Sequence, residues 1–228
     1  MNIEGKAALV TGGGSGLGEA TARELARLGA QVAVLDVNLD NARRVAEDIG
    51  GIALLCDVTS PDSVQAAIET AAAAHGTARI LMQIAGIGTA KRVIARDGSP
   101  APLEDFAKVI NVNLIGSYNV ARLFAAACAK AEPMEDGERG VIINTASVAA
   151  YEGQLGQVAY AASKGGIVAL TLPVARELAR SGIRCMTIAP GIMETPMLLG
   201  MPPEVQDSLN KMVPFPTRMG KPAEFAAL

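Results

Sequence analysis

Short apolar runs alternate with longer amphipathic stretches along the whole chain. The apolar runs lack the two-residue polar alternation of a strand that exposes one face, and they are typical of strands buried on both faces. These runs occupy residues 7–10, 31–35, 52–55, 80–84, 141–143 and 183–188. Apolar residues at helical spacing fill the stretches between them, over about 16–29, 39–49, 61–75, 102–130 and 154–181. The pattern predicts strands and helices in regular alternation.

Residues at the ends of the helical stretches support this assignment. Ser60 followed by Pro61 predicts a helix start, with the serine as N-cap and the proline at the first helical position. Glycine follows four of the helical stretches, where a left-handed C-cap favours it, at Gly29, Gly50, Gly76 and Gly182. The alternation predicts an α/β fold, a doubly wound parallel sheet with helices on both faces. Ligands bind such a sheet beyond the carboxyl ends of its strands.

Two longer segments interrupt the alternation. Residues 89–102 and residues 191–216 lack a clear period, and the second segment is rich in Met and Pro. Loops of this length in a compact domain usually carry function.

Composition restricts the class of protein. The 228 residues are 50% hydrophobic, which excludes disorder and fits a single domain over residues 1–228. A formal charge of −3 without a basic run argues against a nucleic-acid partner. No apolar run reaches the ~20 residues that cross a bilayer, and the first residues do not form a signal or transit peptide. We therefore expect no membrane partner.

The scarcity of histidine and cysteine narrows the chemistry. His75 is the one histidine and lies in an Ala-rich stretch, where we interpret it as a solvated residue near a helix end. The cysteines at 56, 128 and 185 are far apart, and no CxxC or HExxH motif occurs, so we expect no metal site. Spaced cysteines of this kind are typical of reduced, buried thiols in a cytoplasmic protein.

A glycine-rich loop follows the first predicted strand. In Thr11-Gly-Gly-Gly-Ser-Gly-Leu-Gly18 the glycines let backbone amides approach a pyrophosphate at the start of the next helix. The spacing is neither GxGxxG nor that of a P-loop. The position of the loop between a strand and a helix is what supports its assignment as a phosphate-binding loop.

Asp36 ends the second predicted strand. A carboxylate there accepts hydrogen bonds from both ribose hydroxyls of an adenosine and repels a 2′-phosphate, so NAD is favoured over NADP. The alternative is a helix cap, a role that Asn38 or Asp40 could also fill. Asp57, after the third strand, is a further candidate near the adenine, although alone it is more typical of a structural residue.

Tyr160 and Lys164 lie one helical turn apart in the stretch that begins near Gln154, so they share a helix face. An ammonium ~4 Å from a phenol, at an effective dielectric of ~20, attracts the phenolate by ~4 kcal/mol. That attraction lowers the phenol pKa from ~10 toward ~7 at most. A phenol so tuned could remove a proton from an alcohol. Ser147, which we place at the end of the fifth strand, completes the candidate site.

These motifs together resemble the short-chain dehydrogenase/reductase family. The similarity extends over essentially the whole chain, through Thr11-Gly12-x3-Gly16-x-Gly18, Ser147, Tyr160-x3-Lys164 and Pro190-Gly191. The resemblance implies that Tyr160 is the general base in oxidation and that Lys164 lowers its pKa and binds the nicotinamide ribose. It also implies that Ser147 holds the reacting oxygen and that Asn113, rather than Asn111, supports a proton-relay water.

The same resemblance implies a set of cofactor-binding residues for NAD. They are Gly12, Ser15, Gly16, Leu17, Gly18, Asp36, Asp57, Val58, Ala85, Gly86, Tyr160, Lys164, Pro190, Gly191, Ile192 and Thr195. Gln154 and Gln157 are implied substrate contacts beside Ser147 and Tyr160, with helix capping as the alternative for the glutamines. A homotetramer is the assembly that the family implies.

Finer features are similar to the short-chain-type 3-hydroxyacyl-CoA dehydrogenases of fatty acid metabolism, the 17β-hydroxysteroid dehydrogenase type 10 branch. Residues 137–147, 152–157 and 212–216 carry this similarity, as does the cationic loop with Lys91, Arg92 and Arg96. We therefore expect NAD-dependent oxidation of the 3-hydroxyl of a short or branched acyl-CoA. Alternatives are a 3-oxoacyl-(carrier protein) reductase, a steroid or sugar alcohol dehydrogenase, and a catalytically silent NAD-binding scaffold.

Three features depart from the family pattern. Gln83-Ile-Ala-Gly86 replaces the usual Asn-Asn-Ala-Gly or Asn-Cys-Ala-Gly, and Arg79 stands where an aspartate is usual. The chain also ends at Leu228, in a helical stretch, where the family continues into a last strand. The glutamine puts local stability in question. For the ending, either the given sequence is incomplete or a subunit-contact element is missing, and the second alternative would put assembly and activity in question.

Overall fold

The computed structural model of the chain describes residues 1–200 and 202–228. Within them, a parallel sheet has the strand order β3-β2-β1-β4-β5-β6, the order of a doubly wound dinucleotide-binding fold. The strands are β1 Ala7–Thr11, β2 Gln31–Asp36, β3 Ile52–Leu55, β4 Ile80–Gln83, β5 Gly140–Thr145 and β6 Ile183–Ile188. The predicted fold class and strand positions are confirmed, and most boundaries agree within one or two residues.

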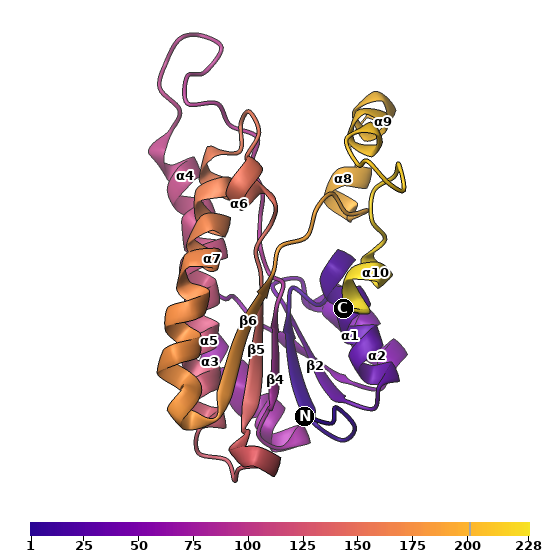
Figure 1. Cartoon of the computed structure of the whole chain (residues 1–228), viewed down its shortest axis with the longest axis vertical. Coiled ribbons are helices and arrows are strands. Elements are labelled where there is room, and N and C mark those ends of the chain that lie inside the picture. The colour runs from indigo at the N-terminus through magenta and orange to yellow at the C-terminus, as the bar shows by residue number, and fades with distance from the viewer. Residues whose placement is uncertain (201) are drawn as a thin grey trace.

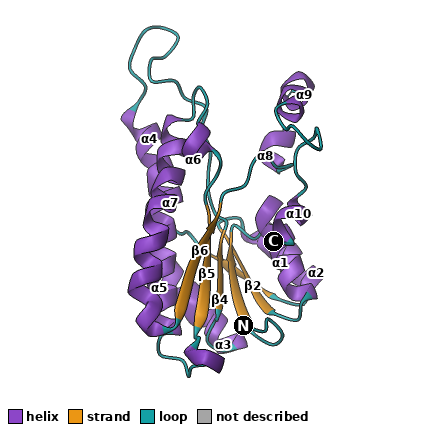
Figure 2. Ribbon diagram, in the orientation of Figure 1, coloured by secondary structure: helices purple, strands orange, loops and turns teal. Residues whose placement is uncertain are grey.

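Helices cover both faces of this sheet (Figures 1 and 2). On one face lie α3 Pro61–His75, α5 Ser117–Cys128 and α7 Val158–Leu178. On the other face lie α1 Gly16–Arg27, α2 Leu39–Ile49 and α10 Pro222–Ala226. Alternate residues of β1 enter different cores, because Ala7 and Leu9 pack on the first side and Ala8 and Val10 on the second. Burial on both faces explains why the strand sequences lack polar alternation.

Strand register brings the candidate site residues to one edge of the sheet. Thr11 at the end of β1 lies beside Leu35 on one side and Gln83 on the other. Gln83 in turn lies beside Asn144 of β5, whose last residue, Thr145, pairs with Ile188 of β6. The loops that follow these strands therefore meet above the carboxyl edge.

The predicted helix ends are mostly confirmed. Ser60 caps α3 by accepting a hydrogen bond from the amide of Ser63, with Pro61 in the first turn. Gly50 and Gly182 adopt the left-handed conformation at helix ends. Gly29 has a positive φ, and Gly76 has φ 78° with ψ 177°, outside the left-handed helical region.

The two longest helical stretches are subdivided. Residues 103–128 form α4 Leu103–Ile110, a π-helical segment Asn111–Gly116 and then α5. The predicted helix from Gln154 begins at Val158 instead, preceded by a short helix α6 Ala149–Glu152, and it ends in a 3₁₀ turn, Ala179–Ser181. A similar 3₁₀ turn, Glu135–Gly137, precedes β5.

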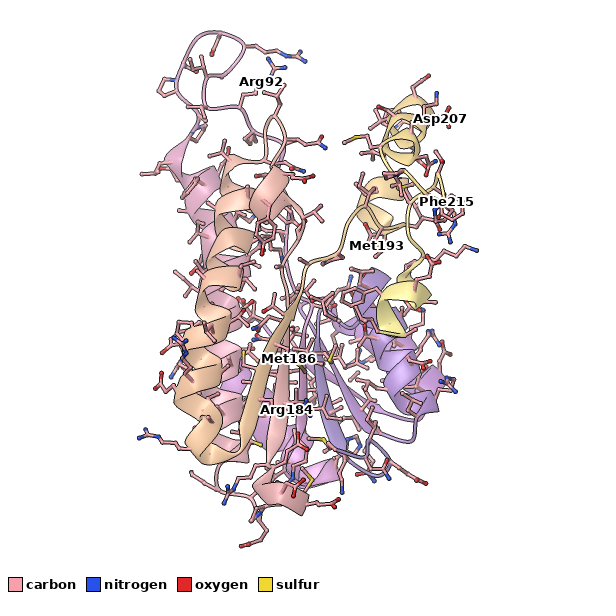
Figure 3. The ribbon with its side chains drawn as sticks, viewed as in Figure 1. Arg92, Arg184, Met186, Met193, Asp207 and Phe215 are labelled. Atoms are coloured by element: carbon pink, nitrogen blue, oxygen red, sulfur yellow. The ribbon has the colours of Figure 1, made fainter. Side chains whose placement is uncertain are left out.

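The two long segments stand out beside the carboxyl edge as separate arms (Figure 1). Residues 89–102 form a loop closed by a bridge between Ile94 and Pro100. The segment 191–216, expected to be irregular, contains α8 Pro196–Leu199 and α9 Pro203–Lys211. Figure 3 shows Arg92 on the first arm and Asp207 on the second.

Among the residues that the structure describes, one helix, Val158–Ser181, is long and apolar enough to cross a membrane by length and composition. The expectation that no apolar run is long enough to cross a bilayer is therefore wrong for this helix, in which Lys164 is one of few charged residues. Only 17% of the most apolar part of the helix is buried. A single helix of this kind is weak evidence for a membrane, since core helices of other proteins pass the same test.

Candidate active site

The glycine loop between β1 and α1 is too tight for side chains. A Cβ on Gly18 would lie 2.0 Å from the carbonyl oxygen of Gly12, and a Cβ on Gly12 would lie 2.8 Å from the backbone of Ala85. Gly12 and Gly16 also have positive φ, 65° and 55°. The loop therefore packs its backbone directly against the first turn of α1 and the chain after β4.

The first turn of α1 suits a phosphate. Among the described residues, the N-cap Ser15 makes no side-chain hydrogen bond to the helix. The amides that open an α-helix have no partner inside it, and the helix dipole favours an anion there. A bare backbone cradle at a helix N-terminus fits the pyrophosphate of a dinucleotide, through Ser15, Gly16, Leu17 and Gly18.

Asp36 lies where the sequence predicts it, at the end of β2. Its Oδ2 accepts a hydrogen bond from the amide of Gly14 (3.0 Å) and its Oδ1 one from the amide of Asn38 (2.9 Å). Asn38 provides the cap of α2 by accepting from the amide of Asn41. The helix-cap alternative for Asp36 is thus wrong, and its half-buried carboxylate is fixed beside the glycine loop.

Asp57 has a structural role in this conformation. Its Oδ1 accepts hydrogen bonds from the amide and the hydroxyl of Thr59, and its own amide donates to Ser63. The next residue, Val58, is buried, and its carbonyl accepts from the side chain of Asn119 on α5. The turn after β3 is thereby tied to the helix that packs beneath it.

Tyr160, Lys164 and Ser147 come together above β5. Tyr160 and Lys164 share a face of α7, with the Lys164 ammonium 5.7 Å from the Tyr160 ring centroid. Ser147 lies two residues beyond the end of β5 rather than within the strand, and a hydrogen bond links it to the Tyr160 phenol. A further hydrogen bond, from the amide of Ala149 to Ser147 Oγ (3.1 Å), fixes the serine at the start of α6.

The predicted fall in the pKa of Tyr160 is wrong for this conformation. Burial raises the pKa of Tyr160, and only the hydrogen bond with Ser147 opposes that rise. The ammonium of Lys164 lies over the ring face and donates instead to the carbonyl of Thr145 at 2.6 Å. The lysine is therefore directed at the end of β5 and not at the phenol oxygen.

Lys164 is itself an unusual group, because it is 5% exposed. Burial lowers the pKa of Lys164 to about 8. Beside it, the hydroxyl of Thr145 is buried and finds no hydrogen-bond partner among the described residues. The polar groups around Lys164 are thus incompletely paired in the protein alone, which fits a polar ligand such as a nicotinamide ribose.

Asn113, and not Asn111, enters this site, as predicted. Asn113 is fully buried, and its carboxamide clamps the backbone of Ile87 by accepting from the amide (2.8 Å) and donating to the carbonyl (2.9 Å). It also donates to Ser163 Oγ. Asn113 lies in the π-helical segment, a rare element that often marks functional sites. No pattern in the sequence predicts the π-helical segment.

Gly86 permits this arrangement. A Cβ there would lie 3.2 Å from Asn113 Oδ1 and 3.7 Å from Lys164 Nζ. Gly86 thus joins the predicted cofactor side of the site to the catalytic side.

The segment after β6 crosses the glycine loop. A Cβ on Gly16 would lie 3.3 Å from Pro196 and 3.7 Å from Thr195. The Pro190 carbonyl accepts from the amide of Val148, and the Ile192 carbonyl accepts from the amide of Gly220. Gly191 lies between these two residues, so the predicted nicotinamide segment spans from Ser147 to the glycine loop. Met193 lies on this segment, at the base of the arm in Figure 3.

The predicted substrate glutamines lie at the mouth of the site, before α7. The amide of Gln154 donates to Gln157 Oε1, and Gln154 Nε2 approaches the sulfur of Met212 at 3.8 Å. Gln157 is the N-cap residue of α7 without a side-chain bond to the helix in the described structure. These contacts fix the turn and leave Gln154 exposed.

Sequence reasoning missed the role of Gln83 and Asn144 beneath the site. Gln83 Nε2 donates to Asn144 Oδ1 at 2.8 Å, and Asn144 Nδ2 donates to Thr187 Oγ1. Gln83 is 4% exposed and Asn144 1%. The replacement of asparagine by glutamine is therefore accommodated by a cross-strand hydrogen bond. Arg79, the other departure, donates to the carbonyl of Arg139.

Two further predictions concern groups outside the site. The three cysteines are free and buried, as predicted. His75 is the last residue of α3 and is half-buried rather than solvated, and its Nδ1 finds no partner among the described residues. The described residues hold no cluster of His, Cys, Asp and Glu able to bind a metal ion.

Known proteins share this geometry. A family model described as short chain dehydrogenase matches residues 6–204. The 3-hydroxyacyl-CoA dehydrogenase type-2 of Bos taurus is 50% identical over 230 residues, which cover 100% of this chain and 88% of the relative. The crystal structure of 3-hydroxyacyl-CoA dehydrogenase type-2 from Mycobacterium avium superposes with a TM-score of 0.92 at 46% identity, over 98% of this chain and 87% of that one.

A more distant neighbour carries a bound cofactor. The crystal structure of 3-ketoacyl-(acyl-carrier-protein) reductase from Brucella melitensis complexed with NADH has a TM-score of 0.87 and 33% identity, over 99% of this chain and 89% of that one. The family match, the relatives that cover the whole chain and the tyrosine, lysine and serine beside a glycine loop agree. The chain is an oxidoreductase that belongs to the short-chain dehydrogenase family.

Proposed function

We propose that this protein oxidises the 3-hydroxyl of a short or branched 3-hydroxyacyl-CoA to the 3-oxo product, with NAD as the oxidant. The observation that carries the proposal is that Ser147, Tyr160 and Lys164 meet at one place. The chain at Ala85 and Gly86, which packs against both Gly12 and Lys164, connects that place with the glycine loop. Full-length similarity to proteins named 3-hydroxyacyl-CoA dehydrogenase type-2 supports the substrate class.

The residues present fit a nicotinamide dinucleotide. Gly12 to Gly18 would hold the pyrophosphate, Asp36 the adenosine ribose, and Lys164 the nicotinamide ribose, with residues 190–195 beside the ring. NAD bound there supplies a hydride acceptor for the alcohol carbon. The carboxylate of Asp36 supports NAD over NADP, because a 2′-phosphate would meet a negative charge.

Side chains of the protein remove the hydroxyl proton and bind the substrate oxygen. Tyr160 takes the hydroxyl proton as general base, while Ser147 donates a hydrogen bond to the substrate oxygen and holds it beside the phenol. The raised pKa of Tyr160 in the free protein implies that the phenolate needs further positive charge near its oxygen. Lys164 is the cation on the same helix face, and it would have to turn from the Thr145 carbonyl toward the phenol to supply that charge. Asn113 keeps the chain at Ile87 in place beside it.

Cations at the mouth of the site support a coenzyme A thioester. Arg92 and Arg96 lie exposed on the arm 89–102, where they are able to meet phosphates. Lys91 on the same arm is within 3.4 Å of Asp105, so part of its charge is already balanced. Arg92→Gln combined with Arg96→Gln is expected to raise KM for an acyl-CoA severalfold and to leave KM for the matching pantetheine thioester unchanged.

Exposed apolar side chains support assembly as a homotetramer. Leu103, Phe106, Ile115, Tyr118 and Leu172 on α4, the π-helical segment, α5 and α7 are between 38% and 73% exposed. A second copy of the chain would cover this surface and the apolar face of α7. Sedimentation of the purified protein tests this, and a monomer or a dimer at micromolar concentration would contradict the tetramer.

The test of the proposed function is NADH formation on a panel of 3-hydroxyacyl-CoAs. Tyr160→Phe is expected to lower kcat about 10²–10⁴-fold, the range for loss of a general acid–base group. Tyr151→Phe is the matched control, because Tyr151 lies on α6 and is 72% exposed. Wild-type turnover in Tyr160→Phe would overturn the mechanism.

Two other outcomes of the panel point to other functions. Turnover confined to carrier-protein thioesters with NADPH would favour a 3-oxoacyl reductase. NAD binding without turnover of any alcohol, including steroids and sugars, would favour a scaffold role.

A further inference from the structure

Four charged side chains form a network beside the glycine loop. Glu19 of α1 accepts two hydrogen bonds from Arg44 of α2, at 2.8 and 2.6 Å, and it also accepts from Arg23 at 2.9 and 3.1 Å. Arg23 in turn binds Asp48 at 2.7 Å. The Arg44 hydrogen bond is the main reason that the pKa of Glu19 lies below its usual range. Glu19 is thus an ionised partner that occupies both terminal nitrogens of Arg44.

Arg44 also touches the glycine loop itself. Its Nη2 donates to the carbonyl of Gly14 at 3.1 Å. The amide of the same glycine donates to Asp36 Oδ2 at 3.0 Å. One residue of the loop therefore separates the guanidinium from the carboxylate expected to bind the adenosine ribose. A Cβ on Gly14 would lie 2.9 Å from Asp36 Oδ2, so the three groups are closely packed.

An arginine at this place bears on the choice between NAD and NADP. Its planar guanidinium is the group that best recognises a phosphate, and an arginine near the ribose accommodates a 2′-phosphate in NADP-binding proteins. Arg44 comes later in sequence, on the next helix, which is why the strand-end motif at Asp36 shows no such cation. Its contacts with Glu19 and Gly14 direct it away from this use.

We propose that Glu19 is a specificity-determining residue that keeps Arg44 from binding a 2′-phosphate. The proposal rests on the proposed function only in that the glycine loop binds a nicotinamide dinucleotide. Discrimination against NADP then depends on two carboxylates. Asp36 repels the 2′-phosphate, and Glu19 holds the cation that would otherwise attract it. Glu19 does not itself touch the ribose, so it acts as a positioning residue.

The test is the binding of NADH and of NADPH, followed by nicotinamide fluorescence without any acyl substrate. Asp36→Asn removes the repulsion and keeps an acceptor oxygen for one of the two amides, Gly14 or Asn38, that the carboxylate accepts from. The lost hydrogen bond is common to every variant compared in this background. Glu19→Gln in that background removes the negative charge and one of the two acceptor oxygens that hold Arg44. We expect NADPH to bind about tenfold more tightly than in Asp36→Asn alone, as for one added charge-assisted hydrogen bond. NADH affinity is expected to change less than threefold. Adding Arg44→Gln should remove the NADPH gain.

Glu24→Gln is the matched control in the same background. Glu24 lies on the same helix and pairs with Arg27, and neither residue is among the contacts of the glycine loop. This variant should leave the ratio of NADPH to NADH affinity unchanged. Thermal unfolding of every variant establishes that it is folded.

Two results would overturn the proposal. One is an NADPH affinity in Asp36→Asn/Glu19→Gln no better than in Asp36→Asn. The other is a gain that persists when Arg44 is also replaced. The test compares the affinities for NADPH and NADH, so it can be interpreted whichever cofactor the wild-type protein prefers. Failure of the acyl-CoA assay would contradict the proposed function and would not affect this binding test of Glu19.

Discussion

The two halves of the site are built in different ways. The half formed by β1, β2, α1 and α2 is shaped by glycine backbone, and its charged side chains pair with one another at the surface, as Arg44 does with Glu19. The half formed by β4, β5 and α7 is shaped by buried polar side chains, such as Lys164 at 5% exposure and Asn113 at 0%. Steric fit therefore governs the first half, whereas desolvation and hydrogen bonding govern the second.

The largest effect is expected where backbone meets backbone in the first half. Gly18→Ala introduces a Cβ 2.0 Å from the carbonyl oxygen of Gly12, so α1 has to move away from the loop. Overpacking of this kind costs about 3 kcal/mol of unfolding free energy, and more where no side chain can yield. Urea denaturation measures that loss, and NADH affinity should fall more than tenfold.

Gly165→Ala is the matched control, because a Cβ on Gly165 would meet no described atom within 4 Å apart from its chain neighbours and the backbone of its own helix. Alanine in the interior of α7 should raise stability by up to about 1 kcal/mol. If Gly18→Ala and Gly165→Ala lower the unfolding free energy equally, steric fit does not distinguish the first half from the second.

In the second half, the buried charge of Lys164 should make stability depend on pH. Burial lowers its pKa from 10.5 to about 8 in the folded protein. Between pH 8 and pH 10.5 the unfolded chain binds the extra proton, so this residue's contribution to stability rises with pH in that window. The full penalty, up to about 3 kcal/mol, is present below pH 8.

Lys164→Met isolates this contribution. The variant is expected to be more stable than the wild type at pH 7, and its advantage should shrink as the pH rises toward 10. The comparison has to be between the two proteins, because the raised thiol pKa values of Cys56, Cys128 and Cys185 make both lose stability above pH 9. A difference that stays constant from pH 7 to 10 would contradict the burial of a charge.

The first half could largely be predicted from the sequence, because its determinants are local. The glycine loop follows one buried strand, and the aspartate ends the next strand along the chain. Strand topology places the ends of these two neighbouring strands side by side. The network of Glu19 and Arg44 could not be predicted, since it joins two helices whose angle only the packed sheet fixes.

The second half could be predicted by residue identity but not by geometry. Tyr160, Lys164, Ser147 and Asn113 come together as expected, whereas the π-helical segment leaves no trace in apolar spacing. The direction of Lys164 was also not predictable. Helical spacing puts it on the face of Tyr160, and only the position of the Thr145 carbonyl shows where its proton donors point.

A smaller effect is expected at Gln83. Gln83→Met keeps the volume of the side chain and removes the donor to Asn144 Oδ1, which is then buried without that partner. A lost buried hydrogen bond of this kind costs about 1–2 kcal/mol. Gln65→Met is the control, since Gln65 binds Glu69 on the exposed side of α3. Equal unfolding free energies for the two variants would contradict the role of the buried network.

The smallest effect is expected for the surface ion pairs of the first half. Arg43 pairs with Asp40 at 3.2 Å, and the two side chains are 58% and 91% exposed. Solvent screens such a pair, so Arg43→Gln should change the unfolding free energy by less than about 0.5 kcal/mol. Gln83→Met removes a neutral hydrogen bond, and Arg43→Gln removes a salt bridge. The loss of unfolding free energy is nevertheless expected to be larger for Gln83→Met, because burial and not formal charge sets the cost. A larger loss for Arg43→Gln than for Gln83→Met in the same denaturant titration would reverse the assignment of the two halves.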